Sequence, residues 1–388
     1  MKIDDVANQI DFAAPQYVRD AITSLGRTED VRFSPSNRRL AVAGFLDDKI
    51  AVFDVSIAMS DNSKSIALTG GAEILSPYLK QPHGVDFIDD EKIVVANRYG
   101  EACVFELPAG ATGRHELEPL AVIRSDGISS PGSVAVIRNG RDSCEALVCN
   151  NYVHTVTRHR LNAGSARSTD DEILLSKWLD IPDSICVSED KQWIAVSNHN
   201  SHSVFLYENK PSLNASSLPD GILRSYYPHG VRFTSDGRYI LGASAGAPYI
   251  NVYERGDAAW RGVRMPLMSF RVLDSKDFLR GQDGRRADGG AKGIDVDNTA
   301  SILVATCEMQ PLAFFDLSAF LQEARRQQRQ RPAGANSGRS SVTGRRLKEA
   351  VQVGCELYLR QTAAALTRWA FEKVPVLSWV RNKITGLS

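Results

Sequence analysis

Hydrophobic and polar residues alternate along most of this chain in a pattern that recurs about every 50 residues. Each copy has a short alternating run, a polar turn, a β-rich run ending in a small or amide residue, a loop and a third run, as in VRFSPSNRRLAVAGFLDDKIAVFDV. Alternation with a period of two predicts half-buried strands, and the turn residues suit hairpins. The first runs of the six copies begin at Val31, Val85, Val134, Ile185, Val231 and Ile294.

A fourth strand is predicted in the looser segments after the third run, for example at 73–75, 172–175 and 268–272. Four antiparallel strands per unit make a propeller blade. The sequence therefore predicts an all-β fold, a six-bladed antiparallel β-propeller over residues 1–317, although 388 residues alone would suggest two or three domains. The sixth unit lacks a fourth strand, and we expect Tyr17 to Ser24 to close the ring by pairing into the last blade.

Polar side chains from every blade should meet at one end of the central channel. We expect the residue two places before each opening Val or Ile to face the channel, which gives Glu29, His83, Gly132, Asp183, His229 and Lys292. The second strand of a blade runs back to the same end. Its last residues should converge there as well, and they include Asn97, Asn150, Asn198 with His199, Ser244 and Glu308.

This set of carboxylates, imidazoles and amides suggests a metal or ligand site. Mixed carboxylate and imidazole ligands suit a borderline divalent ion such as Zn, Mn or Fe better than calcium. We expect Glu29 and Asp183 to hold the ion and His83 or His229 to act as general base. Ligand-binding roles are expected for Asn97, Asn150, Asn198, Lys292 and Glu308.

Structural roles compete with each of these assignments. Pro-His-Gly is a common turn before a propeller strand, so either histidine can simply bond a loop carbonyl. The three asparagines equally suit turns, and Lys292 can pair with Glu29 where the ring closes. The sequence has no GxSxG, Walker or HExxH motif.

Two short phrases carry a resemblance to known propellers. Pro-His-Gly-Val at 82–85 and 228–231, with Val95-Ala96-Asn97, resembles YVTN and NHL-type repeats, and 181–187 is similar to a blade of the regucalcin/gluconolactonase family. The resemblance spans roughly 15–317 and implies a propeller with one divalent cation held by a Glu, an Asp and Asn residues. Glu29 and Asp183 match the two acids, whereas His83, Gly132, His229 and Lys292 replace the expected asparagines. A lactonase-type hydrolysis is the activity that this resemblance implies.

Targeting and cysteine patterns indicate the cytoplasm. The start, MKIDDVANQIDFAAP, has no basic and apolar regions of a secretory signal, and no run of about 18 apolar residues occurs. The six cysteines show no CxxC spacing, and we interpret them as reduced structural thiols.

Residues 318–388 differ from the repeats. Residues 318–330 are predicted to be helical and 331–344 form a Pro/Gly/Ser-rich linker. Residues 345–388 form a basic amphipathic tail with an apolar face from Leu347 to Trp369. From residue 318 onward there are thirteen basic and four acidic residues, against 33 and 42 before it, so a net charge of zero conceals two opposite parts. The tail suits docking on the propeller or a protein partner, or on an anionic membrane, and nucleic acid is unlikely.

We therefore predict a binding or interaction module that holds a small polar ligand or a partner loop at the channel mouth, with the tail as a tether. The alternative is a metal-dependent lactonase-type hydrolase built on the same residues. The stretch 276–290 is predicted to be either a lid or disordered.

Overall fold

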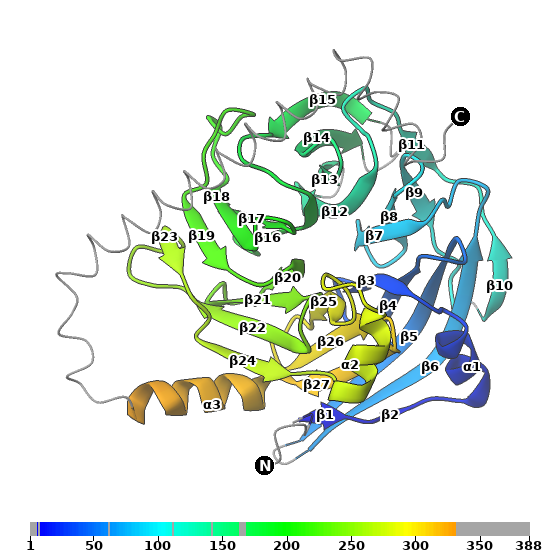
Figure 1. The fold of residues 1–388 in the computed structure, drawn as a ribbon. Helices are drawn as coiled ribbons and strands as arrows, with labels where there is room; N and C mark the ends of the chain where they lie inside the picture. Colours follow the sequence, from blue (N-terminus) through cyan, green and yellow to red (C-terminus); the bar gives the residue numbers. More distant parts are fainter. Residues whose placement is uncertain are drawn as a thin grey trace. The chain divides into compact units, whose positions relative to one another are not determined.

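The chain folds into a ring of six antiparallel blades around a central channel (Figure 1). The structure is a computed structural model that describes residues 6, 8–60, 63–110, 112–140, 143–162 and 168–330. The predicted all-β, six-bladed propeller is confirmed. All six repeats coincide with blades, because each alternating run forms an innermost strand.

The first three blades follow the chain in order from the channel outward. Blade 1 consists of β3 (Thr28–Phe33), β4 (Arg39–Gly44), β5 (Lys49–Ser60) and β6 (Ser63–Leu75). Blade 2 consists of β7 (Pro82–Phe87), β8 (Lys92–Asn97), β9 (Ala102–Glu106) and β11 (Ala121–Ile123). Blade 3 consists of β12 (Pro131–Arg138), β13 (Ser143–Asn150), β14 (Thr155–Asn162) and β15 (Ser168–Leu175).

The remaining blades repeat this arrangement, and the last takes its outer strand from the N-terminus. Blade 4 consists of β16 (Pro182–Val187), β17 (Trp193–Asn198), β18 (Ser203–Glu208) and β19 (Gly221–Arg224). Blade 5 consists of β20 (Pro228–Phe233), β21 (Tyr239–Ser244), β22 (Tyr249–Glu254) and β24 (Met268–Arg271). Blade 6 consists of β25 (Ala291–Val296), β26 (Ile302–Cys307), β27 (Gln310–Asp316) and β1 (Gln9–Ile10).

An N-terminal strand closes the ring, but not the one expected from the sequence. The closing strand is β1, which pairs antiparallel with β27 through Gln9 opposite Phe315 and Ile10 opposite Phe314. The expected segment, Tyr17 to Ser24, instead forms α1 (Gln16–Thr23). Val18 and Ile22, four residues apart, lie one turn apart on the same face of the helix, and both are buried. In a strand they would also share a face, but they would lie about twice as far apart.

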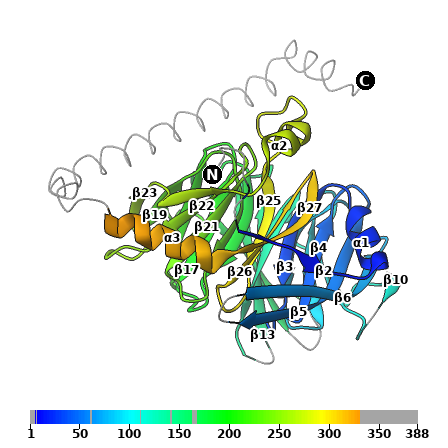
Figure 2. The ribbon, with the colours of Figure 1, turned by 90° about the horizontal axis from the view of Figure 1, so that it is seen from below.

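Several short strands and one short helix are added to the blades. Two strands extend blade 1 in parallel on β6, namely β2 (Phe12–Ala13) and β10 (Gly113–Glu116), and β23 (Gly262–Arg264) adds to β19 of blade 4. The stretch 276–290 overlaps α2 (Ser275–Gln282), which projects from one end of the blades (Figure 2). Asp274 caps this helix by accepting a hydrogen bond from Asp277 N.

The predicted helix after the last blade is present as α3 (Leu317–Gln330). Its Phe320 and Leu321 are buried with side chains of blades 5 and 6, and Phe320 stacks on Phe270 at 3.8 Å between ring centroids. The linker and tail predicted for 331–388 lie outside the described residues. Among the described residues, no helix is long and apolar enough to cross a membrane.

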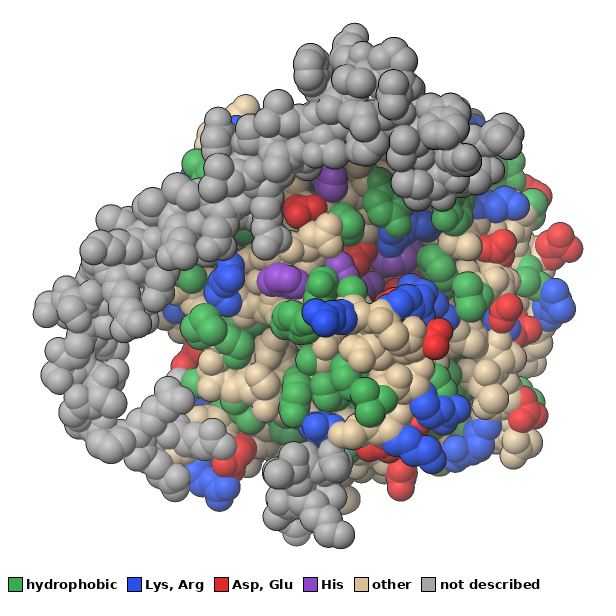
Figure 3. All heavy atoms as spheres, in the orientation of Figure 1, with side chains coloured by type: hydrophobic (Ala, Val, Ile, Leu, Met, Phe, Trp, Pro, Cys, Tyr) green, Lys and Arg blue, Asp and Glu red, His purple; other side chains and the backbone are tan. Residues whose placement is uncertain are grey.

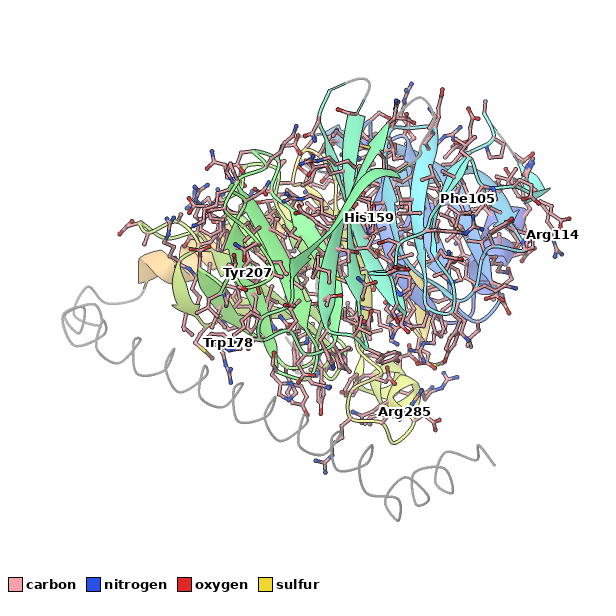
Figure 4. All side chains as sticks on the ribbon, turned by 90° about the horizontal axis from the view of Figure 1, so that it is seen from above. Phe105, Arg114, His159, Trp178, Tyr207 and Arg285 are labelled. Carbon is pink, nitrogen blue, oxygen red and sulfur yellow. The ribbon has the colours of Figure 1, made fainter. Side chains whose placement is uncertain are left out.

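Alternating apolar side chains form the core between neighbouring blades. Leu40, Val42 and Phe53 of blade 1, for instance, pack in one cluster with Phe314 of blade 6. Aromatic residues of the third strands, such as Phe105 and Tyr207, are fully buried within the packed sheets (Figure 4). The five described cysteines are buried and unpaired by disulfides.

Candidate functional site

A β-bulge at the start of each innermost strand places one residue at the channel. The pairing of first and second strands shifts register directly after Thr28, Pro82, Pro131, Pro182, Pro228 and Ala291. Bulges commonly re-aim side chains beside functional sites. The residues at these shifts are the expected ring: Glu29, His83, Gly132, Asp183, His229 and Lys292. Glu29, His83, Asp183 and His229 come together, so this part of the expected geometry is present.

Two imidazoles and two carboxylates form the centre of the site. His83 Nε2 lies 3.5 Å from Glu29 Oε2 and 3.9 Å from Asp183 Oδ1. His229 Nε2 lies 3.2 Å from Glu29 Oε2 and 3.4 Å from Asp183 Oδ2. The two rings stack at 5.4 Å between centroids, and all four side chains are buried. Figure 3 looks onto this end of the molecule, where histidine and charged side chains gather near the centre of the face.

The Glu29 carboxylate has one satisfied and one unsatisfied oxygen. Oε1 accepts hydrogen bonds from Arg27 Nε and, at 3.1 Å, from Lys292 Nζ. Burial raises the pKa of Glu29, but Lys292, His83, His229 and Arg27 outweigh that cost and hold it well below its usual value. Oε2 is buried and has no hydrogen bond of acceptable geometry. Glu29 is therefore an anion with a free acceptor aimed at the imidazoles.

The pKa values of the two central histidines shift in opposite directions. His83 Nδ1 lies 2.5 Å from the carbonyl oxygen of Gly132, which can only accept, so Nδ1 carries the proton and Nε2 points toward the carboxylates. Burial, aided by Arg98, lowers the pKa of His83 to about 3. Burial also opposes protonation of His229, but the Asp183 and Glu29 carboxylates prevail and raise its pKa.

Three residues from consecutive blades hold Asp183. Arg98 Nη2 lies 3.4 Å from Oδ1, Asn151 Nδ2 donates to Oδ1, and His199 Nδ1 lies 3.5 Å from Oδ2. Burial raises the pKa of Asp183, but His229, His83 and Arg98 lower it well below its usual value. Asp183 is thus an ionised carboxylate next to both imidazoles.

The asparagines expected to bind ligand serve the loops instead. Asn97, Asn150 and Asn198 each accept a backbone N–H from the loop that leads into their own blade, donated by Lys80, Ser129 and Asp180. Their amide groups donate to backbone carbonyls, at Glu101, Val148 and Val196. This is the turn-forming role that their residue type also suggested, and it leaves their amides engaged within the blade.

The side chains that face Asp183 lie one position later in the sequence. Arg98, Asn151 and His199 directly follow the three asparagines, and their backbone N–H groups bond the carbonyls of Gln81, Ser130 and Ile181. Side chains alternate along a strand, so a shift of one residue changes the face. The sequence reasoning named His199 only beside Asn198 and missed Arg98 and Asn151. The signal that could have found them is this alternation, counted from the end of each second strand.

Lys292 and Glu308 sit on the side of the site toward α2. Lys292 bridges Glu29 Oε1 and Asp288 Oδ1, at 3.1 Å each, which is the expected pair across the ring closure. Glu308 lies 3.6 Å from Arg285, which belongs to the segment after α2 at the edge of the molecule in Figure 4. These ion pairs tie the segment after α2 to the mouth.

The opposite end of the channel holds a second group of buried charges beside a cavity of about 460 Å³. Three carboxylates, Asp30, Asp86 and Asp295, share two guanidinium groups, Arg32 and Arg232. Asp30, Asp86 and Asp295 also accept backbone N–H groups from the next blade, at Val85, Val136 and Phe33. This group links inner strands across blades, with three carboxylates against two guanidinium groups.

Comparisons with known proteins support the fold. No family model and no curated protein match the chain. A solved structure of a functionally unknown protein from Desulfotomaculum acetoxidans is similar with a TM-score of 0.50 and 14% identity, over 75% of this chain and 83% of that one. Identity this low supports the fold alone.

Two further solved structures align less closely. The β-propeller domain of Cps50 (Swd1) from Myceliophteria thermophila has a TM-score of 0.45 and 11% identity, over 80% of this chain and 99% of that one. Hydrazine synthase from Kuenenia stuttgartiensis has a TM-score of 0.44 and 14% identity, over 74% and 83%. At these scores neither bears on function.

Proposed function

We propose that this protein is a propeller-type binding module that holds a small polar ligand at the channel mouth around Asp183. The observation that carries the proposal is a group of buried polar atoms without hydrogen-bond partners: Glu29 Oε2, Arg98 Nε, Asn151 Oδ1 and His199 Nδ1. Buried polar atoms are almost always paired. Four such atoms near Glu29 and Asp183, whose carboxylates both lie beside the two imidazoles, support a site at which a bound molecule supplies the missing hydrogen bonds.

The unpaired atoms suggest the chemistry of that molecule. Arg98 Nε is a fixed donor, whereas Glu29 Oε2 and Asn151 Oδ1 are acceptors. A ligand that matches them needs both acceptors and donors within a few ångströms. Hydroxy acids combine a carboxylate with hydroxyl groups that donate and accept, so we propose a polyhydroxy carboxylate as the ligand class.

Calorimetric titration with gluconate tests this proposal. We expect binding by the wild-type protein and a roughly fivefold loss of affinity in Asn151→Ala, because about 1 kcal/mol of hydrogen bonding disappears. Arg124→Gln, an exposed change at the Glu101 ion pair away from the channel, is the control and should bind as the wild type does. Absence of binding by the wild type, or equal binding by a folded Asn151→Ala protein, would overturn the proposal.

A metal-dependent hydrolase of the lactonase type is the second candidate. The ionised Asp183 carboxylate beside two imidazoles favours it, as does the resemblance of 181–187 to the gluconolactonase family. A metal ion, when bound, would polarise the ester carbonyl and acidify water. Asp183 would then be placed to take a proton from that water.

An assay of glucono-1,5-lactone hydrolysis, in which a pH-stat measures the acid released, tests the hydrolase. We expect Asp183→Asn to lower kcat by roughly 100-fold or more, as loss of a general base does. If the wild-type protein does not hydrolyse the lactone, this candidate is excluded. The binding module is tested separately, by the gluconate titration.

A further inference from the structure

We propose that Glu29, His83 and His229 bind one divalent transition-metal ion of the zinc class at the channel mouth. The metal site stands on its own geometry. The additional statement that the ion anchors the polar ligand rests on the proposed function.

The three ligand atoms already have the spacing of a coordination sphere. Glu29 Oε2, His83 Nε2 and His229 Nε2 all lie within 4.8 Å of one another, and the carboxylate oxygen is 3.5 and 3.2 Å from the two nitrogens. Metal–ligand bonds of about 2.0–2.1 Å in tetrahedral geometry separate ligand atoms by about 3.3 Å. The observed carboxylate–imidazole separations therefore match a shared ion without a large movement of either strand.

The surroundings of each ligand orient it toward the ion. The Nδ1–H of His83 donates to Gly132 O, which directs the Nε2 lone pair toward Glu29. Such a bond on the second nitrogen is the usual support of a metal-bound histidine. Lys292 and Arg27 occupy Glu29 Oε1 and leave Oε2 as the free ligand atom.

The unpaired Oε2 is an independent sign of a missing cation. Glu29 is 1% exposed, and its Oε2 faces the Nε2 lone pair of His83. The nearest other nitrogen, His229 Nε2 at 3.2 Å, makes no hydrogen bond of acceptable geometry with it. A buried acceptor in this position costs free energy unless something positive lies between the two atoms. A metal ion bound to both removes that cost.

The donor set selects the class of metal. Two imidazole nitrogens with one carboxylate suit Zn²⁺, Co²⁺ or Ni²⁺, whereas Ca²⁺ and Mg²⁺ prefer six or more oxygen ligands. Asp183 is not part of the set that lies within 4.8 Å. The geometry thus assigns His83 and His229, expected from the sequence as general bases, to the metal, and leaves Asp183 beside it.

Titration of chelator-treated full-length protein with Zn²⁺, Co²⁺ and Ca²⁺, by calorimetry at fixed pH, tests the site. We expect one Zn²⁺ per chain and at least 100-fold weaker Ca²⁺ binding. His83→Asn and His229→Asn should each weaken Zn²⁺ binding about 100-fold or more, since even outer-shell changes cost 10–100-fold. His115→Asn, on β10 and outside the ligand set, is the matched control and should retain Zn²⁺ binding.

The visible spectrum of the Co²⁺ protein is a second readout, and far-ultraviolet circular dichroism verifies that each variant is folded. Ligand-field bands that are lost in both folded histidine variants and kept in His115→Asn support the site. A wild-type protein without stoichiometric Zn²⁺ binding overturns it. Equal Zn²⁺ affinity in folded His83→Asn and His229→Asn overturns it as well. Gluconate binding by the chelator-treated protein separates the two proposals, because the binding module can survive loss of the metal site.

Discussion

At the scale of single residues, position decides what a histidine does in this protein. His83 and His229 face two carboxylates at the channel mouth. His154 and His202 instead accept the backbone N–H groups of Ile181 and Tyr227, and so hold the entry loops of blades 4 and 5. Identical side chains therefore serve the site in one place and loop structure in another, and only their spatial neighbours distinguish them.

Gly132 is a residue whose small size the site requires. A Cβ atom there would lie 1.7 Å from Asn151 Oδ1, so Gly132→Ala must displace the side chain that holds Asp183. We expect a loss of about 1–3 kcal/mol in the free energy of unfolding, measured with urea, together with weaker gluconate binding. Gly100→Ala is the control, because its nearest contacts at 3.4 Å are ordinary, and it should change stability by less than about 0.5 kcal/mol. A Gly132→Ala protein as stable as the control would contradict this packing.

Asp295, at the other end of the channel, should make stability depend on pH near neutrality. Burial raises its pKa to about 7 against the pull of Arg32. The unfolded pKa is about 3.9, so the native state binds the extra proton and stability falls as pH rises from about 4 to about 7. The free energy of unfolding of the wild type relative to Asp295→Asn, measured with urea, should be about 2–3 kcal/mol greater at pH 5 than at pH 8. The same difference at both pH values would show that Asp295 does not titrate in this range.

At the scale of elements, one loop device recurs at the mouths of blades 2 to 5. Gln81, Ser130, Ile181 and Tyr227 all have positive φ, between 41° and 52°, directly before a proline that begins the inner strand. Their carbonyls accept the N–H of the residue that follows the second strand, which is Arg98, Asn151, His199 or Ala245. Non-glycine residues adopt this conformation at a cost of about 1–3 kcal/mol, a strain that tends to occur at functional sites. The repeated turn thus supplies the fixed frame on which the mouth residues are held.

The helix α3 should contribute to the stability of the propeller. Phe320 is buried against Phe270, and Arg325 Nε donates to Tyr239 Oη on blade 5. Phe320→Ala should lower the free energy of unfolding by about 3–5 kcal/mol, measured with urea, because a buried aromatic ring is lost. Arg326→Ala, whose exposed side chain pairs with Glu323 on the same helix, should change it by less than about 0.5 kcal/mol. Equal effects of the two substitutions would mean that α3 adds nothing to the fold.

At the scale of the whole molecule, the balanced net charge divides into two opposite parts. Residues 1–317 carry 33 basic and 42 acidic residues, and the remainder carries thirteen and four. The propeller is therefore acidic and the C-terminal segment 318–388 is basic. We propose that segment 345–388 is a tether to an acidic surface, and its amphipathic pattern with Trp369 suits an anionic membrane.

Flotation with liposomes tests the tether. We expect the full-length chain to float with anionic vesicles and not with neutral ones, because each basic residue near an anionic surface contributes about 1 kcal/mol. A chain ending at Gln330 keeps α3 and removes ten basic and three acidic residues, so it should stay at the bottom of the gradient. Equal partitioning of the two chains would exclude the membrane and leave a protein partner as the target of the tether.

Periodicity by itself determined the six blades, their inner strands and the ring of Glu29, His83, Asp183 and His229, because alternation is local and each repeat restates it. Tertiary structure decided the rest. The closing strand β1 is two residues long, too short to show a hydrophobic pattern. It pairs with β27, which is far away in the sequence, because closure of the ring brings the N-terminus to the last blade. Arg98 and Asn151 lie in blades 2 and 3, and they meet Asp183 of blade 4 because the ring brings these blades together at the channel mouth. The sequence specifies the residue types and their local alternation, whereas the contacts between side chains of different blades depend on how the six blades close around one axis.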